Sequence, residues 1–349
     1  MSFLDTVARY LPQVISPTQK KLPLGTKGKW TLIVLLAYFL MKHIPLYGLG
    51  SASLSQFASL SVILGADFGS MISLGIGPIV TASIVLQLLN GSGLVKFNTS
   101  DSRGRAHYQA INKLLAIAFV VVESAVYVLM GGLSPLESLA GTSLYFTMQL
   151  VLIFQLILGG LMIMLLDDLC QKWGLGSGLS LFIAAGVSES LFIRAFSWIL
   201  PAGADYPAGA FPIILQAFSA GDTGLIMVQL GAIVATIGVF MMAIYFQAMK
   251  VEIPLSFGRV RGHGMRWPLN FLYTSNIPVI LIAALLANLQ LFSSLADNAF
   301  GWTWANGISS WLTAPNLIGT MLQAKSLAIG STIYLQALSY TIVLMAGSV

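Results

Sequence analysis

The stretch ISLGIGPIVTASIVLQLL, residues 72–89, carries a helix break inside an otherwise apolar run. Gly75, Gly77 and Pro78 lie where a membrane-spanning helix would need an unbroken backbone. Non-helical backbone at membrane depth survives only where it is buried in protein or lines a cavity. The break therefore predicts an internal cavity beside the start of the next helix. Pro78 suits the first turn of that helix, where its missing N–H needs no partner.

The rest of the chain has the composition of a membrane protein. Of its 349 residues, 57% are hydrophobic and 8% are charged, whereas soluble domains carry about 25% charged residues. A spanning helix needs roughly 20 apolar residues, and apolar runs of that length argue against a barrel of short alternating strands. We expect an all-α polytopic membrane protein with eight spans, at residues 30–49, 76–90, 109–132, 144–166, 178–200, 223–249, 270–294 and 328–347.

The distribution of charge predicts the orientation of these spans. Of the 17 lysines and arginines, all but Lys42, Arg194 and Lys325 precede the first span or fall in alternate loops. This asymmetry predicts a cytoplasmic N-terminus. Within the cytoplasmic segment 1–29, apolar residues at helical spacing favour a short helix on the membrane surface, with a frayed tail as the alternative. The single cysteine, Cys170, excludes an internal disulfide and a cysteine-based metal cluster.

A half-length apolar piece precedes the break, and aliphatic pairs follow it and two other candidate kinks. The piece, about residues 55–68, is helix-patterned but too short and too polar to span, which predicts a re-entrant helix entering from outside. The pairs are spaced to share one helix face. From spacing alone, ordinary helix packing is the more frequent explanation for them. They are Ile76 and Val80, Leu179 and Ile183, and Ile277 and Ile280.

Polar residues inside the spans are few. Glu123 is central in the third span, and Gln87 and Asn276 lie in the second and seventh. Ionisable groups are costly at these depths, so Glu123 is either a proton or ion site or a hydrogen-bonded structural group. Between the sixth and seventh spans, the basic loop at about 250–269 is either a topology anchor or a docking loop for a polyanion such as a ribosome.

Four stretches in order along the chain resemble the SecY family, in its archaeal form. They are ISLGIGPIVTASIVLQLL, LLDDLCQKWGLGSGLSLFIAAGVSESLF, KVEIPLSFGRVRGHG and LNFLYTSNIPVILIAALLANLQL. The resemblance implies a clamshell of ten helices in two pseudo-symmetric halves. Residues 30–200 would be the N-terminal half with spans 1–5, and residues 201–349 a partial C-terminal half with spans 6–8. The ninth and tenth spans of the family have no counterpart, so we expect the chain to be a fragment or to be completed by another chain.

The resemblance also implies a function and its residues. The chain would be the central pore-forming subunit of a protein-conducting channel, with a plug, an apolar pore ring, a lateral gate and a ribosome-docking loop. Expected partners are a SecE-like gamma subunit, a small beta subunit, the ribosome, the nascent polypeptide with its signal sequence, and membrane lipid. The implied residues are Phe57, Leu60, Val62 and Leu64 in the plug; Ile76, Val80, Leu179, Ile183, Ile277 and Ile280 in the ring; Gln87, Glu123 and Asn276 at the gate; and Arg259 and Arg261 in the docking loop.

Three other classes of function compete with this one. A secondary transporter also uses broken helices and buried carboxylates, but the breaks here are followed by aliphatic residues rather than polar ligands. An enzyme would need a positioned nucleophile and base; the three histidines lie near span ends or in loops, no HExxH or GxSxG motif is present, and no cofactor-binding loop is found. A scaffold without a pore is the third alternative.

Overall fold

The structure, a computed structural model, describes residues 12–18, 22–52, 64, 66–95, 97, 101–200, 206–255, 265–270, 276–302, 304, 307, 310–313 and 331–348. The chain forms two compact units. The first comprises Met1–Val187 and Val279–Ser348, and the second Ser188–Pro278 with the last residue. The predicted division into two pseudo-symmetric halves stays a prediction.

The secondary structure confirms the helical membrane fold. Each of the eight predicted spans overlaps a helix, and within the described residues five helices are long and apolar enough to cross a membrane: α2, α5, α6, α7 and α9. In the part of the first unit that the structure describes, the helices are α2 (Leu24–Lys42), α4 (Gly77–Gly91), α5 (Ser102–Leu129), α6 (Ser143–Trp173), the start of α7 (Gly178–Phe196), most of α10 (Asn276–Phe300), and α13 (Ser331–Ser348).

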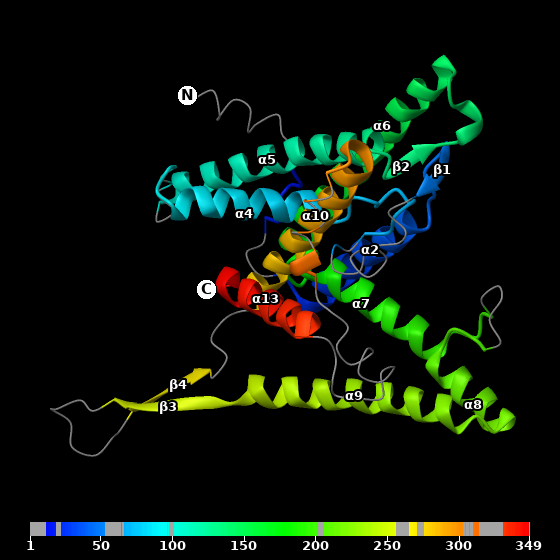
Figure 1. Ribbon diagram of the computed structural model, residues 1–349. Helices are drawn as coiled ribbons and strands as arrows, with labels where there is room; N and C mark the ends of the chain where they lie inside the picture. Colours follow the sequence, from blue (N-terminus) through cyan, green and yellow to red (C-terminus); the bar gives the residue numbers. More distant parts are fainter. Residues whose placement is uncertain are drawn as a thin grey trace. The chain divides into compact units, whose positions relative to one another are not determined.

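The first unit is built around α5 and α6. Helix α5 packs against both α4 and α6, and α6 also packs against α2 (Figure 1). Tyr38 of α2 stacks on Phe182 of α7, with 4.9 Å between their ring centroids, and both side chains are fully buried. Leu152 and Leu156 of α6 belong to the same apolar core. This core holds the starts of α4 and α7 in place.

Two small antiparallel sheets qualify the all-α expectation. In the first unit, β1 (Leu49–Ala52) pairs with β2 (Leu133–Pro135), which a 3-10 turn at Glu137–Leu139 follows. In the second unit, β3 (Lys250–Leu255) pairs with β4 (Met265–Asn270) in one continuous register. Both strands lie within the predicted basic loop at about 250–269, because apolar and polar residues alternate in both of its arms. Arg259 and Arg261 lie outside the described residues.

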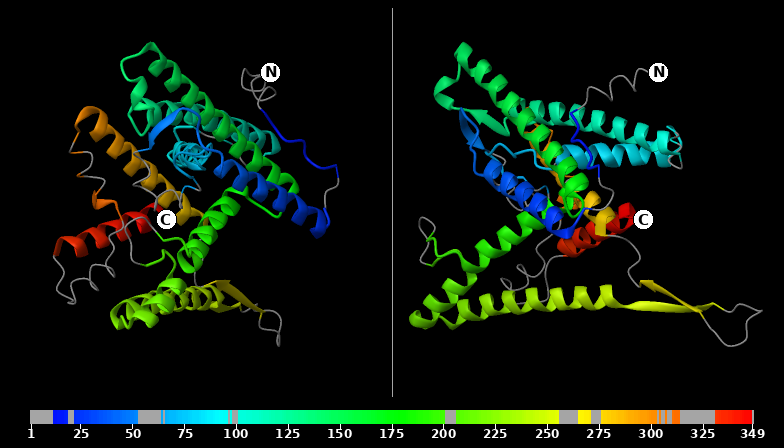
Figure 2. Two further views of the ribbon diagram at one scale, coloured as in Figure 1. Left: turned by 90° about the vertical axis from the view of Figure 1, so that its right-hand side faces the viewer. Right: turned by 180° about the vertical axis from the view of Figure 1, so that it is seen from behind.

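The second unit contains a helix that the sequence analysis did not predict. This helix, α8 (Ala210–Ala220), packs against α9 (Thr223–Ala248), and the β3–β4 hairpin extends from the C-terminal end of α9 (Figure 2). Asp222 caps α9 by accepting hydrogen bonds from Gly224 N and Leu225 N. No residue of α9 is buried within the protein. A helix that is apolar on all sides is typical of a membrane span.

Candidate pore constriction and gate

The predicted helix break lies between the plug segment and α4. Residues 71–76 form turns rather than a helix, and α4 begins at Gly77 with Pro78 in its first turn, as predicted. Gly75 adopts a left-handed conformation, with φ at 57°, and its N–H donates to Ile72 O. The backbone N–H of Ile76 then donates to the carbonyl oxygen of Leu64 over 2.8 Å. This bond joins Leu64, in the predicted plug segment, directly to the start of α4.

Of the four predicted plug residues, the structure describes one. Leu64 is fully buried, while Phe57, Leu60 and Val62 lie outside the described residues. Just after Leu64, Ala66 is buried and Phe68 packs against the same apolar core. The described end of this segment is therefore packed inside the first unit, where backbone that is not helical can be tolerated.

Four of the six predicted ring residues have described side chains, and all four contact one apolar cluster. Ile76 and Val80 of α4 are 0% and 2% exposed and belong to it. Leu179 and Ile183 of α7 are partly buried and pack against it. The side chains of Ile277 and Ile280 lie outside the described residues. The described four face the protein interior, and the complete ring stays a prediction.

The start of α7 is held by a carboxylate on α6. Asp167 Oδ1 accepts a hydrogen bond from Leu179 N over 3.0 Å. Gln171 Nε2 donates to the other oxygen of Asp167. Because Leu179 is a predicted ring residue, this bond places one side of the candidate constriction relative to α6.

A buried polar group lies where α4, α5 and α10 meet. Asn288 Nδ2 of α10 donates to Thr81 Oγ1 of α4 over 2.8 Å, and Thr81 Oγ1 donates to Gly77 O. Glu123 of α5 is fully buried beside them: a Cβ placed on Gly77 would lie 3.1 Å from Asn288 Oδ1 and 3.4 Å from Glu123 Oε2. Among the described residues, neither oxygen of Glu123 has a hydrogen-bond partner.

This group differs from the gate cluster expected from the sequence. Glu123 is in it, but Gln87 is exposed on α4 and the side chain of Asn276 lies outside the described residues. Thr81 and Gln87 are six residues apart, so a helix with about 3.6 residues per turn turns them to different faces. Asn276 precedes Asn288 by about 18 Å along α10. Thr81 and Asn288 are polar residues inside apolar runs, and this pattern could have placed them among the predicted gate residues.

The hydrogen bond between Thr81 and Asn288 should be measurable as a coupling. We expect Thr81→Val and Asn288→Ala each to lower the free energy of unfolding, with a coupling of about 0.6–1.7 kcal/mol between them, because each change removes one side of a bond within the membrane. Thermal unfolding of the wild type, the two single variants and the double variant in detergent measures this coupling. Thr147→Val, the same chemical change on the exposed Thr147 of α6, is the control. Additive losses would contradict the bond.

Comparisons with known proteins agree with this architecture. The SecY family model matches residues 70–347. Protein translocase subunit SecY of Methanothermobacter thermautotrophicus is 41% identical over 326 residues, covering 89% of this chain and 69% of its own. SecY of Pyrococcus horikoshii is 38% identical and is covered over 64% of its length. The chain thus spans about two thirds of the length of these relatives.

Solved structures show the same fold. A protein conducting channel matches with a TM-score of 0.79 and 32% identity over 99% of this chain and 76% of that one. Sec61 in the canine ribosome–channel complex from the endoplasmic reticulum matches with a TM-score of 0.78, also at 32% identity, with the same coverage. The comparisons lend no support to the secondary-transporter alternative, and this chain belongs to the SecY family.

Proposed function

We propose that this chain is the pore-forming subunit of a protein-conducting channel, which passes secretory polypeptides across the membrane and releases hydrophobic segments into lipid through a lateral gate. The observation that carries the proposal is the junction at Ile76. There Ile76 N donates to the carbonyl oxygen of Leu64, which belongs to the segment predicted to be too short to span, and Ile76 and Val80 lie in an apolar cluster that Leu179 and Ile183 of α7 pack against.

An aliphatic constriction suits this function for a physical reason. A narrow apolar collar disfavours water and so blocks ions by dewetting. Aliphatic side chains offer no directional bonds, so an extended polypeptide of any sequence can slide past them. In this proposal Ile76, Val80, Leu179, Ile183, Ile277 and Ile280 form the collar, and the segment around Phe57, Leu60, Val62 and Leu64 is the plug.

The lateral gate would lie between α4 and α5 on one side and α10 and α13 on the other. The Thr81–Asn288 bond joins α4 to α10 across this seam, and Glu123 of α5 lies beside it. The free energy lost when this hydrogen bond breaks is offset when an apolar segment enters the seam and buries its own side chains there. Signal sequences and membrane helices would therefore open the gate according to their hydrophobicity.

We infer the partners of this chain from its family and from the positive charge of its loop at 250–269. We assign the basic loop at 250–269, with Arg259 and Arg261, to ribosomal RNA phosphates; a relative with the same fold is known in a ribosome–channel complex. A SecE-like gamma subunit and a small beta subunit would complete the assembly, which would lie in the cell membrane with its N-terminus in the cytoplasm.

Crosslinking of a stalled nascent chain tests the proposal. A photoreactive amino acid at Ile183 should crosslink to a secretory chain stalled on the ribosome, because the chain must pass the constriction. The same amino acid at Leu36 of α2, which is exposed on the outside of the first unit, is the control and should crosslink to lipid. Equal yields at both positions, or none at Ile183, would reject a pore lined by α7.

A further inference from the structure

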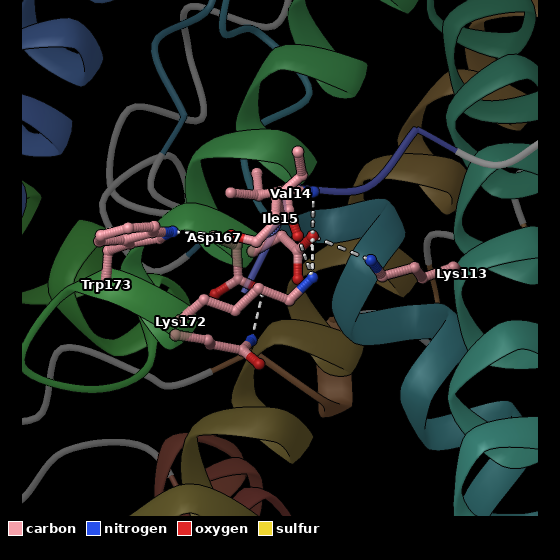
Figure 3. Close-up of polar contacts among 8 residues, drawn as sticks. Val14, Ile15, Lys113, Asp167, Lys172 and Trp173 are labelled. Carbon is pink, nitrogen blue, oxygen red and sulfur yellow. Dashed lines mark hydrogen bonds and ion pairs between the residues drawn. The ribbon is translucent and has the colours of Figure 1, made fainter. Parts of the chain in front are cut away.

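The described N-terminal residues run across the C-terminal end of α6 and are held there by their backbone (Figure 3). Val14 N donates to Asp168 Oδ2 over 2.9 Å, and Lys172 Nζ donates to Val14 O over 2.6 Å. Trp173 Nε1 donates to Ile15 O over 2.8 Å. The side chain of Ile15 is itself 84% exposed. We call residues 12–18 the strap, and these three bonds attach its backbone to α6.

The carboxylate that holds the strap also holds α5. Lys113 Nζ of α5 lies 3.1 Å from Asp168 Oδ2, and Lys172 Nζ lies 3.0 Å from the same atom. The Asp168 side chain is 10% exposed and the Lys113 side chain 23%. One oxygen therefore accepts from the strap, from α5 and from the last turn of α6, so removing its charge loosens three attachments together.

The neighbouring carboxylate holds α7. Asp167 Oδ1 accepts from Leu179 N at the start of that helix. Asp167 and Asp168 are adjacent, so the strap, α5 and the first turn of α7 are all attached to one turn of α6. Because α6 also packs along α2, this turn of α6 is a common support for the strap, α5 and the start of α7.

We propose that Asp167 and Asp168 form a latch, in which Asp168 ties the strap and α5 to α6 while Asp167 ties α7 to the same turn. The proposal rests on the function above, which makes α5 a gate helix and α7 a ring helix. An opening gate must tilt α5, and the Lys113–Asp168 pair, in the N-terminal half of α5, resists this tilt. Both aspartates are positioning residues, and a partly exposed ion pair can break and re-form during each opening.

Distance measurements between spin labels test the latch directly. Labels at Ile15→Cys and Leu175→Cys report on the strap, and labels at Ala106→Cys and Leu175→Cys report on α5. All three positions are exposed, whereas the native Cys170 is buried and stays unlabelled.

In the full chain in lipid nanodiscs, Asp168→Asn should broaden both distance distributions, and Lys113→Met should broaden that of α5. Lys113→Arg should keep the native distributions. Lys29→Met, on an exposed lysine of α2, is the control and should leave both unchanged.

The functional readout is the membrane insertion of a marginally hydrophobic segment. Asp168→Asn and Lys113→Met should raise the ratio of inserted to exported segment about two- to fivefold, the size expected of a partly exposed ion pair. Asp168→Glu keeps the carboxylate and should give the native ratio, which a purely structural role would not require.

The two readouts separate this inference from the proposed function. Unchanged distances in Asp168→Asn would overturn the latch. Broadened distances with an unchanged insertion ratio, while a nascent chain still crosslinks at Ile183, would also overturn it and leave the channel function intact. If no nascent chain crosslinks at Ile183, the channel function fails, and the label distances still decide whether one carboxylate holds the strap and α5 together.

Discussion

Gly75→Ala should lower the free energy of unfolding by about 2–4 kcal/mol, since it combines backbone strain with a steric clash. With φ at 57°, Gly75 has a left-handed conformation that costs an L-residue such as alanine about 1–2 kcal/mol. In addition, a Cβ at this position would overlap the carbonyl oxygen of Leu64 and lie 2.8 Å from Ala66 Cβ. Backbone on both sides of the break would have to move apart.

The matched control for this substitution is Gly91→Ala, at the other end of α4. Gly91 has no atom within 4 Å of a built Cβ, so alanine there should be neutral or stabilise the helix by up to about 1 kcal/mol. Thermal unfolding in detergent compares the two variants. Since the clash falls on the Leu64 carbonyl that Ile76 N binds, Gly75→Ala should also displace Ile76. Equal unfolding temperatures for the two variants would show that the junction is not as close as the structure has it.

Gly159→Ala is the second substitution with a large expected effect. Gly159 lies on the face of α6 that abuts the broken segment, where a Cβ would overlap the carbonyl oxygen of Met71 and lie 3.0 Å from its carbonyl carbon. Backbone cannot rotate away as a side chain does, so α6 must shift from the turns at 71–76. We expect a loss of about 2–4 kcal/mol in the free energy of unfolding.

Gly231→Ala in α9 provides the comparison for Gly159. Both are glycines inside long apolar helices, but nothing lies within 4 Å of a Cβ at Gly231, so the intrinsic helix preference of alanine should dominate there. Small residues let membrane helices approach closely, and the pair of variants isolates that effect. If Gly159→Ala were as stable as Gly231→Ala, the contact between α6 and the broken segment would be excluded.

The helices and the break were predictable because their causes are local. Apolar runs long enough to span, interrupted by Gly75, Gly77 and Pro78, determine where α4 begins whatever surrounds it. The same holds for the other predicted spans, each of which overlaps an observed helix. The short helix α8 was missed because its 11 residues are too few to stand out from the apolar background.

The polar contacts were harder to predict because they depend on which helix faces meet. Asn276 and Asn288 are equally polar in the sequence, but only packing decides that Asn288 meets Thr81. The sequence predicted Glu123 as a carboxylate inside a span, but it did not predict which residues surround it. The strap shows the same limit: its bonds join Val14 and Ile15 to residues about 150 positions away, and they use backbone groups that every residue possesses.

The sequence by itself determined the membrane class, the approximate positions of the helices that overlap the predicted spans, and the helix break, since hydrophobicity and backbone restriction act over a few neighbouring residues. It also carried the motifs that place the chain in the SecY family. Only the tertiary structure decided that Leu64 bonds to Ile76, that Thr81 and Asn288 join α4 to α10, and that Asp167 and Asp168 gather α7, α5 and the strap on one turn of α6. Such contacts arise when whole helices bury their faces together, and no local pattern of residues encodes the partner.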